Sequence, residues 1–141
     1  MLKVAVSHTQ SEDEMETIIK EVSPDAVQVF SPELRNFGSH VLVIRAVGPG
    51  DPVPKDADAL IIDSSHGKGL LYDQEFARKL VGSTEIPVIL AGGLTPENVA
   101  DAIEKVRPFA VDVASGVEKS PGKKDHRKVR EFIRIAKEAD I

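Results

Sequence analysis

The sequence contains no cysteine, no excess of positive charge and no long apolar run, and each absence excludes a class of protein. Without cysteine, this chain supplies no disulfide, no thiolate metal site and no cysteine nucleophile or base. The net charge is -5 at pH 7, whereas a protein that binds nucleic acid or anionic membranes needs a basic stripe. Lys123 and Lys124 form only a local basic pair, for which we expect a solvated turn before the last helix or, in the alternative, the steering of a phosphate. No segment approaches the roughly 20 apolar residues of a membrane span.

The composition predicts one globular domain. The chain has 141 residues, of which 41% are hydrophobic and 29% are charged, which is enough for one packed core and too little for two ordinary domains. No linker or low-complexity segment interrupts it, and the first residues lead into a strand rather than a secretory signal. We therefore expect a single cytoplasmic domain over residues 1–141.

Short apolar runs alternate with amphipathic stretches, which predicts an α/β fold. Six runs are rich in valine and isoleucine and lack strict polar alternation, as is typical of strands buried on both faces of a parallel sheet. These predicted strands are residues 3–7, 26–30, 41–47, 59–63, 87–91 and 110–114.

Helices are predicted between and after these strands. Ser11 and Glu14 have capping-box spacing, Thr95 and Pro96 are suited to the N-cap and first helical position of a helix ending near Val106, and Asp125 can cap the last helix. Residues 31–39 hold at most a short helix, and the proline-rich segment 48–54 holds none. The predicted apolar faces are Met15, Ile18, Ile19 and Val22; Phe76, Leu80 and Val81; Val99, Ala102, Ile103 and Val106; and Val129, Phe132, Ile133 and Ala136.

Two glycine-containing turns follow the last two predicted strands. Gly92 and Gly93 lie in the first turn, which leads into a helix, and Ser115 and Gly116 lie in the second. Glycine lets backbone amides approach a ligand closely, and a helix N-terminus favours an anion. Barrels of alternating strands and helices hold a substrate phosphate at such a pair of turns. A phosphorylated small molecule is therefore the expected ligand; in the alternative, these residues only form tight turns.

Six segments resemble the phosphoribosylanthranilate isomerase family, a barrel enzyme of tryptophan biosynthesis. The similarity runs from about Leu2 to Ile135, in the family's order and with suitable spacing, and the closing segment is the most specific. The segments are DAVQV at 25–29, VIRAV at 43–47, LIIDS at 60–64, AGGLTPENV at 91–99, RPFAVDVASGVE at 107–118 and GKKDH at 122–126.

The resemblance implies a partial (β/α)8 TIM barrel with six parallel strands and crossover helices. The chain aligns from the family's third strand onward, so the first two strand–helix units have no counterpart here. In the family, those units supply a cysteine general base and an arginine for the anthranilate carboxylate. An open sheet would expose interior apolar side chains, so we expect the gap to be filled by an N-terminal fragment, by a second copy of the chain, or by collapse of the sheet. A longer polypeptide is the remaining alternative.

The resemblance also implies an Amadori rearrangement of N-(5'-phosphoribosyl)anthranilate, with neither cofactor nor metal. This chemistry needs an acid for the ring oxygen and a base for the C2' proton. Asp63 matches the family's general acid, or else caps the loop that follows it. Asp112 matches a second carboxylate facing the sugar, or else is a buried polar residue. Gln28 matches a substrate-facing position, but Phe30 stands where the family usually has histidine.

The four histidines and the overall function allow further hypotheses. His8 could replace the missing base, or else is solvated, and His66 could approach the ligand from the glycine-rich loop, which lacks the spacing of a nucleotide-binding loop. His40 and His126 are expected to be structural or exposed. The functional alternatives to an isomerase are a non-catalytic sugar-phosphate-binding half-barrel, or another TIM-barrel enzyme acting on a phosphorylated sugar.

Overall fold

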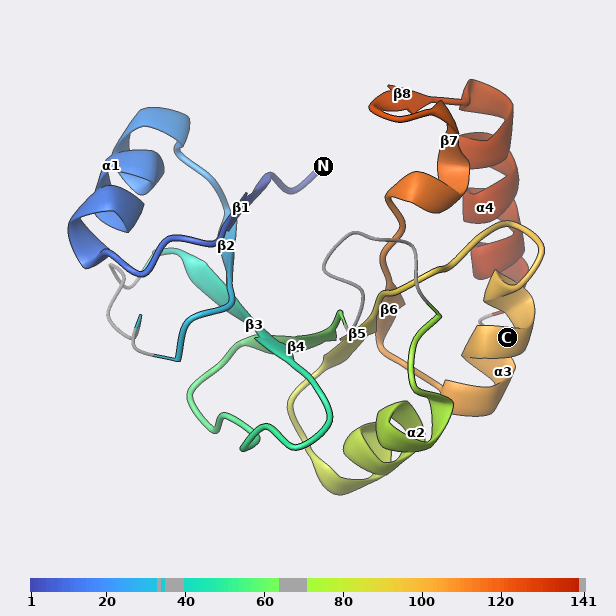
Figure 1. Cartoon of the computed structure of the whole chain (residues 1–141), viewed down its shortest axis with the longest axis horizontal. Helices are drawn as coiled ribbons and strands as arrows, with labels where there is room; N and C mark the ends of the chain where they lie inside the picture. The colour runs from blue at the N-terminus through green and yellow to red at the C-terminus, as the bar shows by residue number, and fades with distance from the viewer. Residues whose placement is uncertain (33, 35–39, 64–70, 140–141) are drawn as a thin grey trace.

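Six parallel strands form one sheet, in the order in which they occur along the chain (Figure 1). The structure is a computed structural model that describes residues 1–32, 34, 40–63 and 71–139. The predicted α/β fold with six parallel strands is confirmed, and β1 and β6 are the edge strands of the sheet as described. The strands are β1 (Val4–Ser7), β2 (Ala26–Val29), β3 (Leu42–Val47), β4 (Ala59–Ile62), β5 (Val88–Leu90) and β6 (Ala110–Val111).

Four α-helices accompany the sheet: α1 (Glu12–Val22), α2 (Gln74–Ser83), α3 (Val99–Val106) and α4 (His126–Ala139). The first three connect β1 to β2, β4 to β5 and β5 to β6, and α4 follows β6. Residues 48–54 contain no helix, as predicted. Most of segment 31–39 lies outside the described residues, as does the loop that contains His66. No described helix has both the length and the apolar character needed to cross a membrane.

The start of α1 confirms the predicted cap but not the whole capping box. Ser11 Oγ accepts the Glu14 backbone N–H at 3.3 Å. The Glu14 carboxylate does not return to the Ser11 amide. It accepts the Thr9 hydroxyl at 2.6 Å, while Thr9 Oγ1 accepts the Ser11 N–H at 3.1 Å. Thr9 therefore takes the place of the second capping-box bond.

Helix α3 begins later than the sequence predicts. Its first residue is Val99, so the assignment of Thr95 as N-cap and Pro96 as first helical residue was wrong. The cause is Asn98, whose Oδ1 accepts the Thr95 N–H at 2.8 Å and whose Nδ2 donates to the Gly93 carbonyl at 3.0 Å. These bonds hold residues 95–98 as a turn, and the helix continues from it to the predicted end at Val106.

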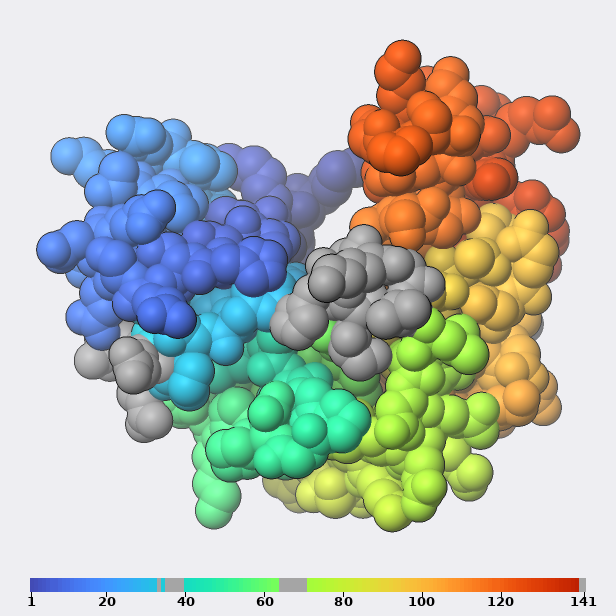
Figure 2. Space-filling model, in the orientation of Figure 1, coloured from blue at the N-terminus to red at the C-terminus, as the bar shows by residue number. Residues whose placement is uncertain are grey.

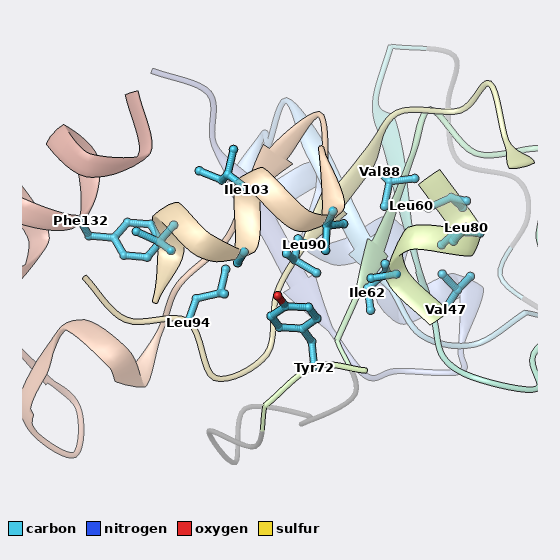
Figure 3. Close-up of a cluster of buried hydrophobic side chains, with 14 of the residues drawn as sticks. Val47, Leu60, Ile62, Tyr72, Leu80, Val88, Leu90, Leu94, Ile103 and Phe132 are labelled. Carbon is cyan, nitrogen blue, oxygen red and sulfur yellow. The ribbon is translucent and has the colours of Figure 1, made fainter. Parts of the chain in front are cut away.

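The last helix confirms its predicted cap and corrects one face residue. Asp125 Oδ1 accepts the backbone N–H of Arg127 at 2.9 Å and that of Lys128 at 3.3 Å. Phe132 is buried and points from α4 toward α3 (Figure 3), but Ile133 is 48% exposed and belongs to the surface. Val22 at the end of α1 is likewise exposed. On both helices, the rest of the protein covers a narrower stripe of side chains than the apolar periodicity indicates.

The main core lies between the sheet and its helices. Residues in register across parallel strands carry their side chains on the same face, so Val29, Arg45, Leu60 and Val88 share one face of the sheet. We call this the outer face. The main cluster of buried side chains, shown in Figure 3, contains Leu60, Val88, Leu80, Ile103 and Phe132. The helices therefore cover the outer face.

The opposite, inner face carries exposed apolar side chains near β1. Val4 and Val6 are in register with Ala26 and Gln28, which places all four on this face. Val4 is 45% exposed, Val6 58% and Leu42 49%. Figure 2 shows a notch between the blue N-terminal part and the orange C-terminal part, which the dark blue end of the chain reaches across. The described residues thus leave the inner face uncovered at the β1 end.

A small hairpin between β6 and α4 was not predicted. The predicted strand 110–114 ends at Val111, and a 3-10 turn, η1 (Ser115–Val117), follows. Strands β7 (Glu118–Ser120) and β8 (Lys123–Lys124) then pair antiparallel around Gly122, whose φ is +78°. The Ser-Pro-Gly sequence at 120–122 is the turn signal that could have revealed this hairpin.

Candidate functional site

The carboxyl ends of β4, β5 and β6 meet around a small cavity of about 40 Å³. Asp63 and Asp112 line it, together with all four glycine-turn residues that the sequence singled out. The complete lining is Asp63, Ala91, Gly92, Gly93, Leu94, Asp112, Val113, Ala114, Ser115 and Gly116. A larger surface hollow of about 810 Å³ lies at the amino ends of β1–β3 and contains none of the predicted site residues.

Backbone hydrogen bonds at the strand ends hold the two carboxylates in place. The Ala91 N–H donates to the Ile62 carbonyl at 3.0 Å, and the Asp112 N–H donates to the Leu90 carbonyl at 2.9 Å. Because side chains alternate along a strand, the residue after Ile62 and the residue after Val111 both turn toward the inner face. Asp63 and Asp112 therefore occupy the same side of the sheet at the same edge.

Glycine is required in the two turns for different reasons. Gly92 and Gly93 have φ values of +105° and +66°, which other residues rarely adopt. At Gly116, a Cβ atom would lie 1.8 Å from the Leu94 carbonyl oxygen. The turn after β6 therefore packs directly on the turn after β5, and Gly116 is needed for this contact between backbones.

The carbonyl groups of the first turn are occupied, while several amides of both turns are not. Gly92 O accepts the Tyr72 N–H at 3.3 Å, and Gly93 O accepts Asn98 Nδ2 at 3.0 Å. Among the hydrogen bonds of residues 71–139, none is donated by the backbone N–H of Gly93, Ser115 or Gly116. The first amides of a helical turn such as η1 also lack partners inside the turn. These amides remain available to an anion.

The cavity is electrostatically unfavourable for two ionised carboxylates. Desolvation by surrounding atoms raises the pKa of Asp112 although its surface is partly exposed, and repulsion from Asp63 raises this pKa further. The nearby Lys124 ammonium acts in the opposite direction. Lys124 is exposed, as expected from sequence, but it lies in β8 rather than in a turn, and its Nζ donates to Ala114 O at 2.7 Å and to Glu118 Oε1 at 3.1 Å.

Gln28 does not reach this cavity. It is 9% exposed and lies on the inner face of β2, two strands away from β4. At the carboxyl ends of β1 and β2, the exposed His8 ring stacks on Phe30 with ring centroids 4.0 Å apart and an interplanar angle of 7°. Sequence reasoning missed this pair, because it depends on the alignment of β1 with β2. His40 and His126 are exposed, in agreement with the sequence expectation. The described part of the chain contains no cluster of three or more histidine, aspartate or glutamate side chains that could hold a metal ion.

Parallel strands in sequential order, helices on the outer face and a site at the carboxyl strand ends define a protein of the TIM-barrel class. The family model described as N-(5'-phosphoribosyl)anthranilate (PRA) isomerase matches residues 1–135. The chain is also 53% identical over 138 residues to N-(5'-phosphoribosyl)anthranilate isomerase of Methanoregula boonei, covering 98% of this chain and 70% of that relative. The chain therefore belongs to the N-(5'-phosphoribosyl)anthranilate isomerase family.

Solved structures agree with this assignment. Phosphoribosyl anthranilate isomerase from Thermus thermophilus superposes with a TM-score of 0.81 at 32% identity, over 97% of this chain and 73% of that one. A phosphoribosyl anthranilate isomerase in complex with reduced 1-(o-carboxyphenylamino)-1-deoxyribulose 5-phosphate superposes with a TM-score of 0.78 at 34% identity, over 98% and 72% of the two chains. The family resemblance read from the sequence is thus confirmed.

The contact between the two turns predicts a sharp difference between two glycines. Gly116→Ala should destabilise the protein by about 1–3 kcal/mol, because its Cβ meets rigid backbone at Leu94. Gly82→Ala in α2 should instead stabilise it by about 0.5–1 kcal/mol, because nothing lies within 4 Å and alanine favours helix. Urea unfolding of both variants measures the difference, and equal stabilities would contradict the packed-turn contact.

The raised pKa of Asp112 predicts a pH-dependent effect of Asp112→Asn. A carboxyl whose pKa is higher in the folded than in the unfolded protein destabilises the folded state once ionised, and this penalty is lost as pH falls through the raised pKa. Asp112→Asn should therefore raise stability at pH 7, by less than about 1 kcal/mol because the side chain is partly exposed. The gain should shrink in acid. Denaturation at several pH values tests this, and a variant less stable than the parent at pH 7 would refute it.

Proposed function

We propose that this protein catalyses the Amadori rearrangement of N-(5'-phosphoribosyl)anthranilate to 1-(2-carboxyphenylamino)-1-deoxyribulose 5-phosphate in tryptophan biosynthesis. One observation carries the proposal: two carboxylates and both glycine turns line a single cavity in a chain of the isomerase family. The related structure that binds a reduced form of the product gives further support, because its fold superposes over nearly all of this chain.

Asp63 acts in this proposal as the general acid. Its protonated carboxyl donates to the ring oxygen of the ribose as the bond from that oxygen to C1' breaks, and the nitrogen lone pair forms a protonated imine. A base then removes the C2' proton, which neutralises the imine to an enolamine, and the enolamine tautomerises to the amino ketone. Asp112 faces the same cavity and contacts the sugar. Gln28 binds the substrate farther along the inner face.

Both turns hold the substrate phosphate. The available amides of Gly93, Ser115 and Gly116 line the same cavity as Gly92, and backbone N–H groups suit phosphate oxygens because they donate without adding a titratable group. In this proposal the phosphate lies at the carboxyl ends of β5 and β6, beside the two carboxylates rather than among them. The phosphate thereby fixes the sugar against Asp63 and Asp112.

The active barrel also contains further strand–helix units beside β1, and these complete the site. The exposed valines of β1 and the exposed Leu42 support this step, since about 1.5–3 kcal/mol accompanies full burial of each such side chain. The units also bring the base for C2', because this chain has no cysteine for that role. A second copy of the chain is the competing occupant of the inner face.

Turnover tests the acid and the completion of the barrel together. The 141-residue chain alone should isomerise substrate near background, and joining it to the part of the Methanoregula isomerase that it does not match should restore turnover. In the joined enzyme, Asp63→Asn should lower kcat by about 10²–10⁴-fold, because an amide cannot protonate the ring oxygen. Asp101→Asn, on the exposed side of α3, is the matched control and should leave kcat unchanged.

Three results would each count against one part of this proposal. Robust turnover by the chain alone would show that it carries its own base, with His8 the first residue to test. Undiminished turnover by Asp63→Asn in the joined enzyme would remove Asp63 as the acid. Binding of the product by the joined enzyme without any turnover would favour a non-catalytic sugar-phosphate-binding protein.

The uncovered inner face predicts association or dye binding by the chain alone. The purified chain should be oligomeric in light scattering, or should bind a hydrophobic dye as a monomer. Val6→Ser on the inner face should reduce this behaviour, whereas Val22→Ser, an equally simple change at an exposed valine of α1, should not. A monomer that binds no dye would contradict the proposal that further strand–helix units cover the inner face. Equal effects of Val6→Ser and Val22→Ser would show that the inner face is not the surface responsible.

A further inference from the structure

Lys124 lies in the β7–β8 hairpin, yet its ammonium group bonds to the rim of the cavity. Lys124 Nζ donates to Ala114 O at 2.7 Å and to Glu118 Oε1 at 3.1 Å. Ala114 lines the cavity and directly precedes Ser115, one of the phosphate-binding residues proposed above. The Lys124 side chain remains 46% exposed, whereas that of Glu118 is only 20% exposed. The ammonium group is therefore held in place by two hydrogen bonds and is still accessible to solvent.

The bond to Ala114 determines the direction of the next amide. In a trans peptide unit the C=O and the following N–H point in opposite directions, and the unit resists rotation. Holding the Ala114 carbonyl toward Lys124 therefore directs the Ser115 N–H away from Lys124. That amide donates to no partner among residues 71–139. An anion in the cavity meets an amide whose orientation is already set.

The Lys124 ammonium group also affects the charge balance of the cavity. Asp63 and Asp112 bring two acidic groups to the lining, and a phosphate ester would add about two further negative charges near neutral pH. Lys124 is the basic side chain whose charge acts on Asp112 in this structure. A fixed positive charge at the rim offsets part of the repulsion that a phosphate would meet.

We propose that Lys124 is a positioning residue for the substrate phosphate: it orients the Ala114–Ser115 peptide and places a positive charge beside the two turns. This inference rests on the proposed function, since it assumes that an anion occupies the turns. A purely structural role is the competing account. The hairpin, however, has other bonds: Gly122 N–H donates to Glu118 Oε2 at 3.3 Å, and Asp125 N–H donates to Val117 O at 2.8 Å.

Titration with inorganic phosphate, followed by amide NMR and calorimetry, tests the proposal on the 141-residue chain. Phosphate should shift the Gly93, Ser115 and Gly116 amide signals of the parent chain. Lys124→Met should weaken phosphate binding by about 2–5-fold, the scale of one partly exposed charge that makes no direct bond to the phosphate, and should move the Ser115 amide signal before any phosphate is added. Lys119→Met removes an exposed lysine from the same hairpin and should change neither property.

A second variant separates positioning from hairpin integrity. Glu118→Gln removes the carboxylate charge that Lys124 neutralises but leaves the Lys124 bond to Ala114 available, so phosphate affinity should be kept or increased. A purely structural salt bridge predicts instead that Glu118→Gln and Lys124→Met weaken binding alike, and that result would overturn the proposal.

The remaining outcomes are also decisive. If phosphate shifts the three amides and Lys124→Met binds it as tightly as the parent, Lys124 has no such role while the proposed phosphate site stands. If phosphate moves none of the amides even in the parent chain, the proposed phosphate site fails, and the role of Lys124 fails with it. If Lys124→Met loses the folded NMR spectrum, Lys124→Arg, which keeps the charge, decides between the accounts. Failure of Lys124→Arg to bind phosphate would then favour the structural account.

Discussion

The register of β4, β5 and β6 is the constraint on which the site depends. Ile62 is aligned with Leu90, and Leu90 with Val111, so the next residues along these strands emerge together at one edge. A slip of one residue would turn Asp63 to the opposite face of the sheet, because side chains alternate strictly along a strand. Ile62 and Leu90 are fully buried on the outer face, which makes such a slip costly. The core thus fixes the position of Asp63, the proposed general acid.

The two faces of the sheet have different roles: the outer face forms the main core, and the inner face carries the candidate site. On the outer face, helices cover aliphatic side chains and form the main core. The inner face carries the two carboxylates at the ends of β4 and β6 and Gln28 on β2, and its apolar side chains near β1 remain partly exposed. A site built on strand ends is held by the rigid packing behind it, so its groups need not form bonds among themselves to stay in place. This leaves the amides of the two turns free for a ligand.

Most of the fold could be predicted from the sequence, because buried parallel strands require apolar runs that are visible locally. The boundaries failed where a side chain from outside the periodic pattern intervened. Asn98 delays the start of α3, and the hairpin after β6 shortens the last predicted strand. Periodicity also gives the direction of a helix face but not the width of its cover, which is why Ile133 and Val22 were misplaced. The outcome shows that local patterns identify elements better than their ends.

The site could be predicted only in part, for a related reason. The family resemblance selected Asp63, Asp112 and the glycine turns, and these residues do meet around one cavity. It could not show that Gly116 is required by contact with Leu94, nor that Lys124 bonds to Ala114, because both depend on how the hairpin folds back. If a phosphate joins the two carboxylates in this small space, as proposed, compensating donors are needed. In the proposed complex the backbone amides supply them without a titratable group, and Lys124 adds a positive charge at the rim of the cavity.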